Sequence, residues 1–354
     1  MSATLSLDYL PFEQLIGQSA AWWRSVLGVV GFERAPHIDR EQIPVTASMT
    51  PLLGSQEPLC EVWRIAADAP VTLNDTAVQD GRIHYRYSDQ LLFGCVRIEE
   101  QNLIRGNQDT AATVLRRATE AAYREIFAVI NATGHLHLIR IWNYLPYINA
   151  HSDGDERYRH FNSARQAAFA QCGRVATATV PAASALGSRA GSPLSIYFIA
   201  ARRTPVMIEN PRQVSAYRYP EQYGAHRPLF SRACVMNARG GTNLFVSGTA
   251  SIVGHETIHH GDVAAQTRET LTNISALLEE ANRKARPSRY TLDSLKYKVY
   301  VRDPADLPAI AAELSAVLDA DTPVVYLQAD VCREELLVEI EASGESADEH
   351  HAGI

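Results

Sequence analysis

The same order of elements occurs twice in this chain, and this repeat limits the possible fold more than any other feature of the sequence. Apolar residues at periods of 2 and 3.6 indicate strand, helix, strand, helix, strand, strand in each copy. The first copy has strands at 91–98, 136–144, 175–180 and 194–200, and helices after Asp109 and at 161–172. The second has strands at 243–252, 295–301, 324–328 and 336–341, and helices after Asp262 and at 307–318. Such a chain can bury its apolar faces by laying two helices on one face of a mixed sheet, twice over.

Short local signals match between the two copies. Asp109-Thr-Ala-Ala opens the first long helix and Asp262-Val-Ala-Ala opens its counterpart, and each Asp is a predicted N-cap. We therefore predict an α+β fold of two related domains, 1–205 and 206–341, with the boundary between Arg203 and Asn210. Residues 342–354 lack apolar anchors and are predicted to be a disordered tail. The alternative is that a β-α-β order recurs here by chance. We infer no chemistry for residues 1–80.

Composition and charge exclude several classes of protein. The 354 residues carry a net charge of −7 with scattered basic residues, which is not the pattern of a nucleic-acid-binding protein. No run of about 18 apolar residues occurs, and the N-terminus lacks a basic region followed by an apolar one, so we predict a cytoplasmic protein without a membrane span. The cysteines are odd in number, far apart and without a CxxC pair, which argues against a disulfide framework or a structural zinc site. They are Cys60, Cys95, Cys172, Cys234 and Cys332.

The second copy carries two separated motifs of a known family. Its long helix begins GDVAAQTRETLTNI, and its last strand reads VEIE at 338–341. These motifs resemble the Rid (YjgF-like) family, which implies that both domains are Rid-like and that the first has diverged. Rid deaminases hold a substrate carboxylate with an arginine upstream of that strand, but the segment 322–325 contains none, which argues against imine deamination. The matching residues of the helix motif are Gly261, Asp262, Gln266, Thr267, Leu271, Asn273 and Ile274.

Two segments in the middle of the chain extend the resemblance to nearly the whole sequence. Residues 141–165 (IWNYLPYINAHSDGDERYRHFNSAR) and 210–233 (NPRQVSAYRYPEQYGAHRPLFSRA) are similar to chorismatases, which join a Rid-like C-terminal domain to a diverged N-terminal one. The resemblance implies cleavage of chorismate to pyruvate and 3-hydroxybenzoate, 4-hydroxybenzoate or both. It implies no cofactor or metal, and a monomer or trimer whose partner is the small-molecule substrate. The alternatives are a chorismate hydrolase that gives a dihydroxycyclohexadiene carboxylate, and a non-catalytic Rid-like protein that binds an aromatic acid.

Glu339 is the candidate catalytic acid. Cleavage of the enol ether of chorismate requires a proton on its methylene carbon, so the acid must remain protonated at neutral pH, and burial raises a carboxyl pKa in this way. On a strand, Val338 and Ile340 share one face while Glu339 and Glu341 share the other. The apolar pair can then pack under the helices while the acidic pair faces a cleft. Periodicity alone leaves the alternative of two solvated glutamates on an open sheet face.

The two carboxylates of chorismate require arginines, preferably bidentate ones. We predict that Arg165 and Arg232 bind them, with Tyr158 and Tyr219 as hydroxyl partners. Tyr158 and Arg165 are seven residues apart, which places them on one face if the segment is helical. The alternative for each arginine is an ordinary surface charge. Weaker candidates for substrate binding are Arg157, Tyr217 and Thr249.

Cys332 lies seven residues before Glu339, in the turn that enters the final strand. Chorismatases with a cysteine at this point give a hydroxybenzoate, and those with a small inert residue give the dihydroxylated cyclohexadiene acid. The resemblance therefore implies a catalytic role for Cys332, in which the thiol favours attack by the ring hydroxyl over attack by water. The alternative is a small buried hydrophobic residue.

His255-Glu256-Thr257-Ile258-His259 spells the HExxH zinc motif, with Glu279 further along the chain. The motif works only when both histidines lie on one face of a sustained helix. Because Gly254 and Gly261 bracket the segment, we predict no such helix and no metal site.

Overall fold

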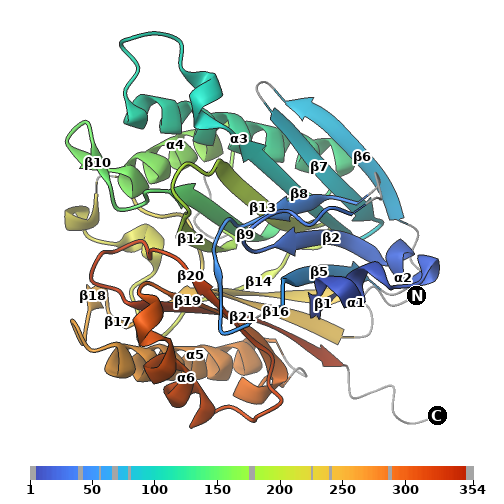
Figure 1. Ribbon diagram of the computed structural model, residues 1–354, viewed down its shortest axis with the longest axis vertical. Coiled ribbons are helices and arrows are strands. Elements are labelled where there is room, and N and C mark those ends of the chain that lie inside the picture. Colours follow the sequence, from blue (N-terminus) through green and yellow to red (C-terminus); the bar gives the residue numbers. More distant parts are fainter. Residues whose placement is uncertain are drawn as a thin grey trace.

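The computed structural model describes residues 5–38, 43–55, 57–65, 71–78, 81–174, 180–224, 226–238, 241–285 and 289–347, and the fold is α+β. Two large sheets face each other, and a pair of helices covers the outer side of each (Figure 1). The predicted architecture of two helices on one face of a mixed sheet, in each half of the chain, is confirmed.

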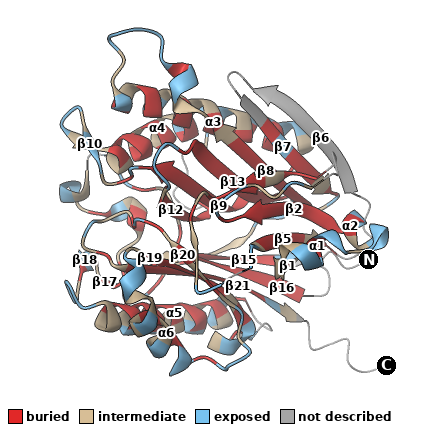
Figure 2. Ribbon diagram, in the orientation of Figure 1, coloured by how far each residue is buried: buried red, intermediate tan, exposed pale blue. Residues whose placement is uncertain are grey.

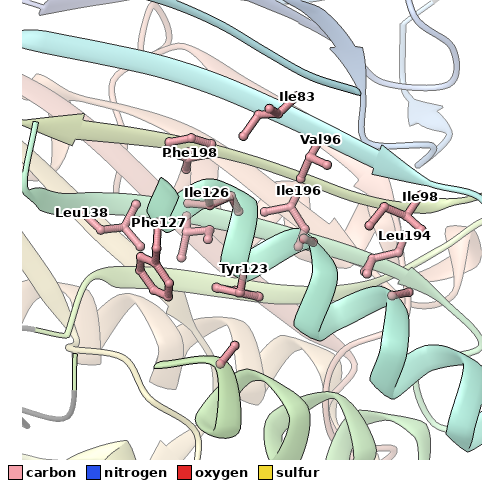
Figure 3. Close-up of a cluster of buried hydrophobic side chains, with 14 of the residues drawn as sticks. Ile83, Val96, Ile98, Tyr123, Ile126, Phe127, Leu138, Leu194, Ile196 and Phe198 are labelled. Atoms are coloured by element: carbon pink, nitrogen blue, oxygen red, sulfur yellow. The ribbon is translucent and has the colours of Figure 1, made fainter. Parts of the chain in front are cut away.

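The first half forms a six-stranded sheet, called here the first sheet, in the order β12-β9-β13-β8-β7-β6. Strands β12 and β9 are parallel, and the other neighbours are antiparallel. Helices α3 (Ala111–Thr133) and α4 (Arg157–Gln171) pack on its outer face through a cluster of buried apolar side chains, in which Tyr123 and Phe127 of α3 face the strands (Figure 3). The strands are β6 (Val71–Val78), β7 (Gly81–Ser88), β8 (Leu91–Ile98), β9 (His137–Pro146), β12 (Ala182–Ser188) and β13 (Leu194–Ala201).

The second half forms a seven-stranded second sheet in the order β14-β15-β16-β21-β19-β20-β4. Helices α5 (Val263–Lys284) and α6 (Leu307–Ser315) cover its outer face. The edge strand β4 comes from the N-terminal region, so this region contributes to the second sheet as well. The strands are β4 (Leu52–Leu53), β14 (Val206–Ile208), β15 (Ala233–Ala238), β16 (Gly241–Thr249), β19 (Leu295–Val301), β20 (Val324–Gln328) and β21 (Val338–Ala347).

The N-terminal residues form a third, four-stranded sheet, β1-β5-β2-β3, called here the N-terminal sheet. Its elements are β1 (Leu5–Pro11), α1 (Phe12–Ile16), α2 (Ala20–Arg24), β2 (Val26–Gly31), β3 (Val45–Ala47) and β5 (Leu59–Ile65). Short pairs β10 (His151–Ser152) with β11 (Asp155–Glu156), and β17 (Ile252–Val253) with β18 (Glu256–Thr257), complete the strands. In the described parts of the connections, 3-10 helices lie at Glu100–Leu103, Ala216–Arg218, Glu221–Tyr223, Leu292–Ser294 and Pro304–Asp306.

A central core joins the three sheets. Trp142 and Tyr197 of the first sheet, Phe245 and Tyr300 of the second, and Trp63 of the N-terminal sheet belong to one buried cluster. The inner faces of the sheets are therefore buried, as the red strands of Figure 2 show. Charged side chains at the centre of these inner faces, such as Glu339, Glu341 and Lys298, therefore lie inside the protein.

Several element boundaries differ from the predictions, and each has a local cause. Thr110, not Asp109, caps α3: its side chain accepts from the Thr113 amide at 3.1 Å, while Asp109 accepts from the Arg105 amide and pairs with Arg117. Asp262 caps α5 as predicted, by accepting from the Ala265 amide at 2.9 Å. Helix α6 ends at Ser315, which leaves Val317 exposed.

The predicted start of the disordered tail, at residue 342, is too early in the sequence. Strand β21 continues to Ala347, because its backbone pairs with β16 on one side and β19 on the other, and this pairing needs no apolar anchors. Most of the strand predicted at 175–180 falls outside the described residues. Strand β14 starts inside the segment where the domain boundary is predicted, and the division at 205 and 206 stays a prediction.

No helix in the described part of the chain is long and apolar enough to cross a membrane.

Candidate active site

A cavity of about 590 Å³ is lined by both halves of the chain. Helix α4 and strand β12 form one side of it, and the loop before β15, the end of β16 and the start of β21 form the other. Six of the seven predicted site residues line this cavity: Tyr158, Arg165, Tyr219, Arg232, Cys332 and Glu339. The structure thus brings together residues that are up to 181 positions apart in the sequence.

Glu339 occupies the inner face of β21. Val338 and Ile340 pack in the helix-side core, so the predicted alternation of faces is confirmed. The Glu339 side chain is 4% exposed and makes no ion pair or hydrogen bond with the described residues. Burial, followed by the charge of Glu341, raises the pKa of Glu339 to about 8, although Arg140 and Arg232 act against this rise. At neutral pH the side chain is therefore a protonated acid that faces the cavity.

Glu341 lies on the same face but behaves differently. Its two oxygens accept from Trp142 Nε1, Ser184 Oγ and Arg140 Nη2 at 2.6 Å each and from Lys298 Nζ at 2.7 Å. Burial alone would raise its pKa, but Lys298 and Arg140 outweigh that effect and the pKa is lowered. The alternative of two solvated glutamates is wrong, because the first sheet covers both. Two neighbouring carboxyls thus occupy opposite protonation states, an arrangement typical of acid–base sites.

Two buried arginines in the cavity have N–H groups without a hydrogen-bond partner among the described residues. Arg165 is 3% exposed, and its Nε and Nη2 atoms have no hydrogen-bond partner among the described residues. Its guanidinium carbon lies 5.3 Å from the ring centroid of Tyr123 and 5.2 Å from that of Phe169. Arg232 Nη2 donates to Tyr219 Oη at 2.7 Å, and its Nε has no partner in the same part of the chain. Buried cations without a counter-charge are suited to binding an anionic ligand.

The weaker candidates lie outside the cavity lining. Arg157 Nη2 forms a 2.6 Å ion pair with Glu100, which gives this arginine a structural partner. Thr249 donates its hydroxyl to the Ser247 carbonyl at 2.9 Å, so the strand backbone occupies it. Tyr217 is likewise not among the described residues that line the cavity. Thr249 is also not among the described residues that line the cavity, and its role as a substrate contact stays a prediction.

Cys332 and Tyr158 meet near Glu339. Burial, with a smaller contribution from Glu339, raises the pKa of the Cys332 thiol to about 12, so it remains neutral. Burial likewise holds the pKa of Tyr158 well above its ordinary range. Cys332 also packs against a small apolar cluster that includes Val331 and Leu336. Its position suits both a packing role and contact with a ligand.

The sequence reasoning missed the residues behind Glu339. Lys298 is the clearest case, because the strand LKYKVYV carries lysines among apolar residues and β19 pairs Lys298 directly with Glu341. Arg333 was also missed: its guanidinium carbon lies 4.1 Å from the Tyr223 ring centroid, and its Nη2 has no partner among the described residues. The alternation of lysines with apolar residues in β19 could have identified Lys298, whereas no local pattern in the sequence identifies Arg333.

The HExxH segment does not form a helix. Glu256 and Thr257 belong to the short hairpin β17–β18, and His259 has a φ of 60°. His255 Nδ1 instead lies 3.3 Å from Tyr223 Oη, and His259 lies near Glu269. Within the described residues, no group of three or more His, Cys, Asp or Glu could hold a metal ion.

Known proteins resemble both halves of the chain. Residues 61–200 match the family model Chorismatase FkbO/Hyg5-like, N-terminal, and residues 227–345 match Endoribonuclease L-PSP. A 3-hydroxybenzoate synthase of Streptomyces hygroscopicus is 36% identical over 330 residues, which cover 90% of this chain and 91% of that protein. A chorismatase of Streptomyces rapamycinicus is 36% identical over 351 residues, which cover 96% and 99%. A chorismatase crystal structure matches with a TM-score of 0.81 and 30% identity, over 97% of this chain and 99% of that one.

Proposed function

The chain belongs to the chorismatase family of enzymes, and on that premise we propose that it cleaves chorismate to pyruvate and a hydroxybenzoate, either 3-hydroxybenzoate, 4-hydroxybenzoate or both. One observation carries the proposal. A buried, protonated carboxyl without a partner, that of Glu339, faces a cavity that also contains two buried arginines with unpartnered N–H groups. Chorismate offers the complementary groups, namely two carboxylates and an enol ether that a proton can activate.

The reaction starts at Glu339. Its proton goes to the methylene carbon of the enolpyruvyl group, which becomes the methyl group of pyruvate, and positive charge develops on the ether carbon. The neighbouring ring hydroxyl oxygen then attacks the ring carbon that bears the ether oxygen, whose bond to that carbon breaks as pyruvate leaves. The hydroxyl proton returns to Glu339. The resulting arene oxide then opens: one C–O bond breaks, a ring carbon loses its proton and the oxygen takes up a proton, which gives the hydroxybenzoate. Chorismate is thus converted without water or a redox partner.

The arginines position the substrate for this step. Arg165 and Arg232 lie on opposite halves of the chain, one on α4 and the other before β15, and each can bind one carboxylate. Tyr219 supports Arg232 through its hydroxyl, which accepts from Nη2. Bound carboxylates would supply the negative charge that the arginines lack, and would also weaken the effect by which Arg232 lowers the pKa of Glu339.

Incubation of the purified protein with chorismate tests the proposal. Pyruvate is followed with lactate dehydrogenase, and the aromatic product is identified by chromatography. Glu339→Gln keeps the shape of the side chain but removes the proton, so pyruvate release should fall by about 10² or more. Glu345→Gln, an exposed position on the same strand, is the matched control. Absence of pyruvate with the folded wild-type protein would overturn the proposed function.

A further inference from the structure

Four buried charged residues form a continuous series of ion pairs behind Glu339, called here the ion-pair chain. Lys298 Nζ lies 2.7 Å from Glu61 Oε2 and 2.7 Å from Glu341 Oε1, and Arg140 Nη2 lies 2.6 Å from Glu341 Oε2. Glu61 belongs to the N-terminal sheet, Lys298 and Glu341 to the second sheet, and Arg140 to the first. Two positive and two negative charges cancel within the ion-pair chain, which is almost fully removed from solvent.

Glu341 is the member of the ion-pair chain beside the acid. It lies two residues from Glu339 on the same face of β21, so their Cα atoms are about 7 Å apart. Four donors hold its carboxylate, and they come from strands β9, β12 and β19. A carboxylate that accepts this many hydrogen bonds stays ionised. A second negative charge on Glu339 would have no counter-ion inside the balanced ion-pair chain.

We infer that Glu341 is a positioning residue, whose fixed negative charge, held by Arg140 and Lys298, keeps the proton on the Glu339 carboxyl. The inference deepens the proposed function and rests on the role of Glu339 as the acid. It also gives the N-terminal sheet a part in the site, because Glu61 balances the second side of Lys298. Lys298 is further enclosed by the Trp142 and Tyr197 rings, whose centroids lie 4.9 and 5.4 Å from Nζ.

The other titratable groups around the two glutamates do not supply this charge. Burial is the largest cause that raises the pKa of each phenol near Glu341, so these phenols are neutral: Tyr9, Tyr144, Tyr197 and Tyr300. On the cavity side, Cys332 and Tyr158 are neutral for the same reason. The cations Arg140 and Arg232 favour ionisation of Glu339, not its protonation. Asp155, Glu156, Glu334 and Glu335 also line the cavity, but among the described residues Glu341 is the carboxylate whose charge raises the pKa of Glu339. Its removal would also expose Glu339 to the charge of Arg140.

The test follows the titration of Glu339 itself. Infrared difference spectra against pH report the C=O stretch of a protonated carboxyl, and the band that Glu339→Gln removes belongs to Glu339. In the wild type we expect a midpoint near pH 8. In Glu341→Gln the midpoint should fall by at least about one pH unit, which at pH 8 lowers pyruvate release about fivefold. At pH 6 both proteins should release pyruvate at similar rates.

Three further variants separate the effect of the Glu341 charge from loss of folding and from a change in net charge. Glu341→Gln leaves an unpaired buried cation, so the double variant Glu341→Gln/Lys298→Met, which removes one charge of each sign, provides a charge-balanced alternative that should fold and show the same shift. Glu341→Asp retains the charge and should restore the wild-type midpoint. Glu61→Gln removes a carboxylate from the far side of Lys298 and should leave the midpoint in place.

An unchanged midpoint in either folded Glu341→Gln variant overturns the inference. An equal shift in Glu61→Gln overturns it as well, because the net charge of the ion-pair chain, and not the position of Glu341, would then control the acid. If the midpoint shifts as expected but the wild type releases no pyruvate from chorismate, the proposed function fails while the role of Glu341 stands.

Discussion

The Glu339 carboxyl lies directly against the Cα atom of Gly248: a Cβ atom added at Gly248 would be 1.9 Å from Oε1 and 2.6 Å from Cδ of Glu339. Gly248 also donates its amide to Ser184 Oγ at 3.0 Å, and Ser184 in turn donates to Glu341. The backbone at Gly248 therefore determines where the proposed acid can stand, and any side chain there must displace it.

Gly248→Ala should move the acid without unfolding the protein. The atom in the way is the end of a flexible side chain, so the Glu339 carboxyl shifts while the strand persists. A displacement of about 1 Å can cost about 10² in rate, and we expect kcat to fall by this order while the melting temperature changes little. Gly106→Ala, where a Cβ meets nothing within 4 Å, is the control. Steady-state kinetics with an unchanged kcat would contradict this account of Gly248.

The pH dependence of activity should follow the Glu339 proton. In the proposed mechanism the protonated form of Glu339 is the active one, and its pKa is about 8, so kcat/KM should be level below pH 8 and fall about tenfold per pH unit above it. The measurement is the initial rate of pyruvate release at low chorismate concentration, from pH 6 to 10. A rate that rises through this range would mean that an ionised Glu339 is required.

Glu339 should also make the stability of the protein depend on pH. An unfolded Glu has a pKa of about 4.3, whereas the folded group has a pKa of about 8, so between these values the folded state binds more protons than the unfolded state. The stabilisation is present below about pH 4.3 and is lost as the pH rises through 8. In urea denaturation, the free energy of unfolding of the wild type should therefore decline relative to that of Glu339→Gln between pH 5 and 9. A constant difference would show that the acid is not held neutral by folding.

Removal of either buried arginine should weaken substrate binding more than it weakens the fold. Arg165→Ala and Arg232→Ala each delete a desolvated partner of a carboxylate, which we expect to cost about 2–5 kcal/mol in binding, seen as a raised KM or inhibitor Kd. Because Arg165 lacks a counter-charge in the described part of the protein, its removal should not lower the melting temperature. Arg283→Ala is the control, since this arginine lies outside the cavity lining on α5, is 64% exposed and is paired with Glu280. Equal effects of all three substitutions would place the carboxylates elsewhere.

Cys332→Ala should change the product and spare bond cleavage. Glu339 and both arginines remain, so pyruvate release continues, while water reaches the space of the thiol. The organic product should shift from hydroxybenzoate toward the dihydroxylated cyclohexadiene acid, and about 1.4 kcal/mol between the two transition states changes the ratio tenfold. Cys172→Ala, at a partly buried cysteine outside the cavity lining, provides the comparison. An unchanged product profile on chromatography would make Cys332 a packing residue.

Local patterns in the sequence were sufficient for the elements and for the face that carries the acid. Strands β8, β19 and β20 have the predicted bounds, and Asp262 caps α5, because apolar periodicity and capping depend on neighbouring residues. Alternation placed Glu339 opposite Val338 and Ile340 for the same reason. The family motifs added Arg165 and Arg232, which periodicity alone could not distinguish from surface charges.

Only the tertiary structure decided what Glu339 and Glu341 face. Arg140 and Glu341 are 201 residues apart, and Glu61 and Lys298 come from different sheets, so no local pattern pairs them. The same packing buries Glu339, leaves Arg165 without a counter-charge among the residues that the structure describes, and keeps Thr249 out of the cavity lining. Side-chain alternation is a property of a single strand, but burial and charge balance depend on how whole sheets stack. That is why the sequence could place the candidate acid on the inner face of its strand, while the burial of Glu339 and the ion pairs that hold the neighbouring Glu341 depend on how the sheets pack.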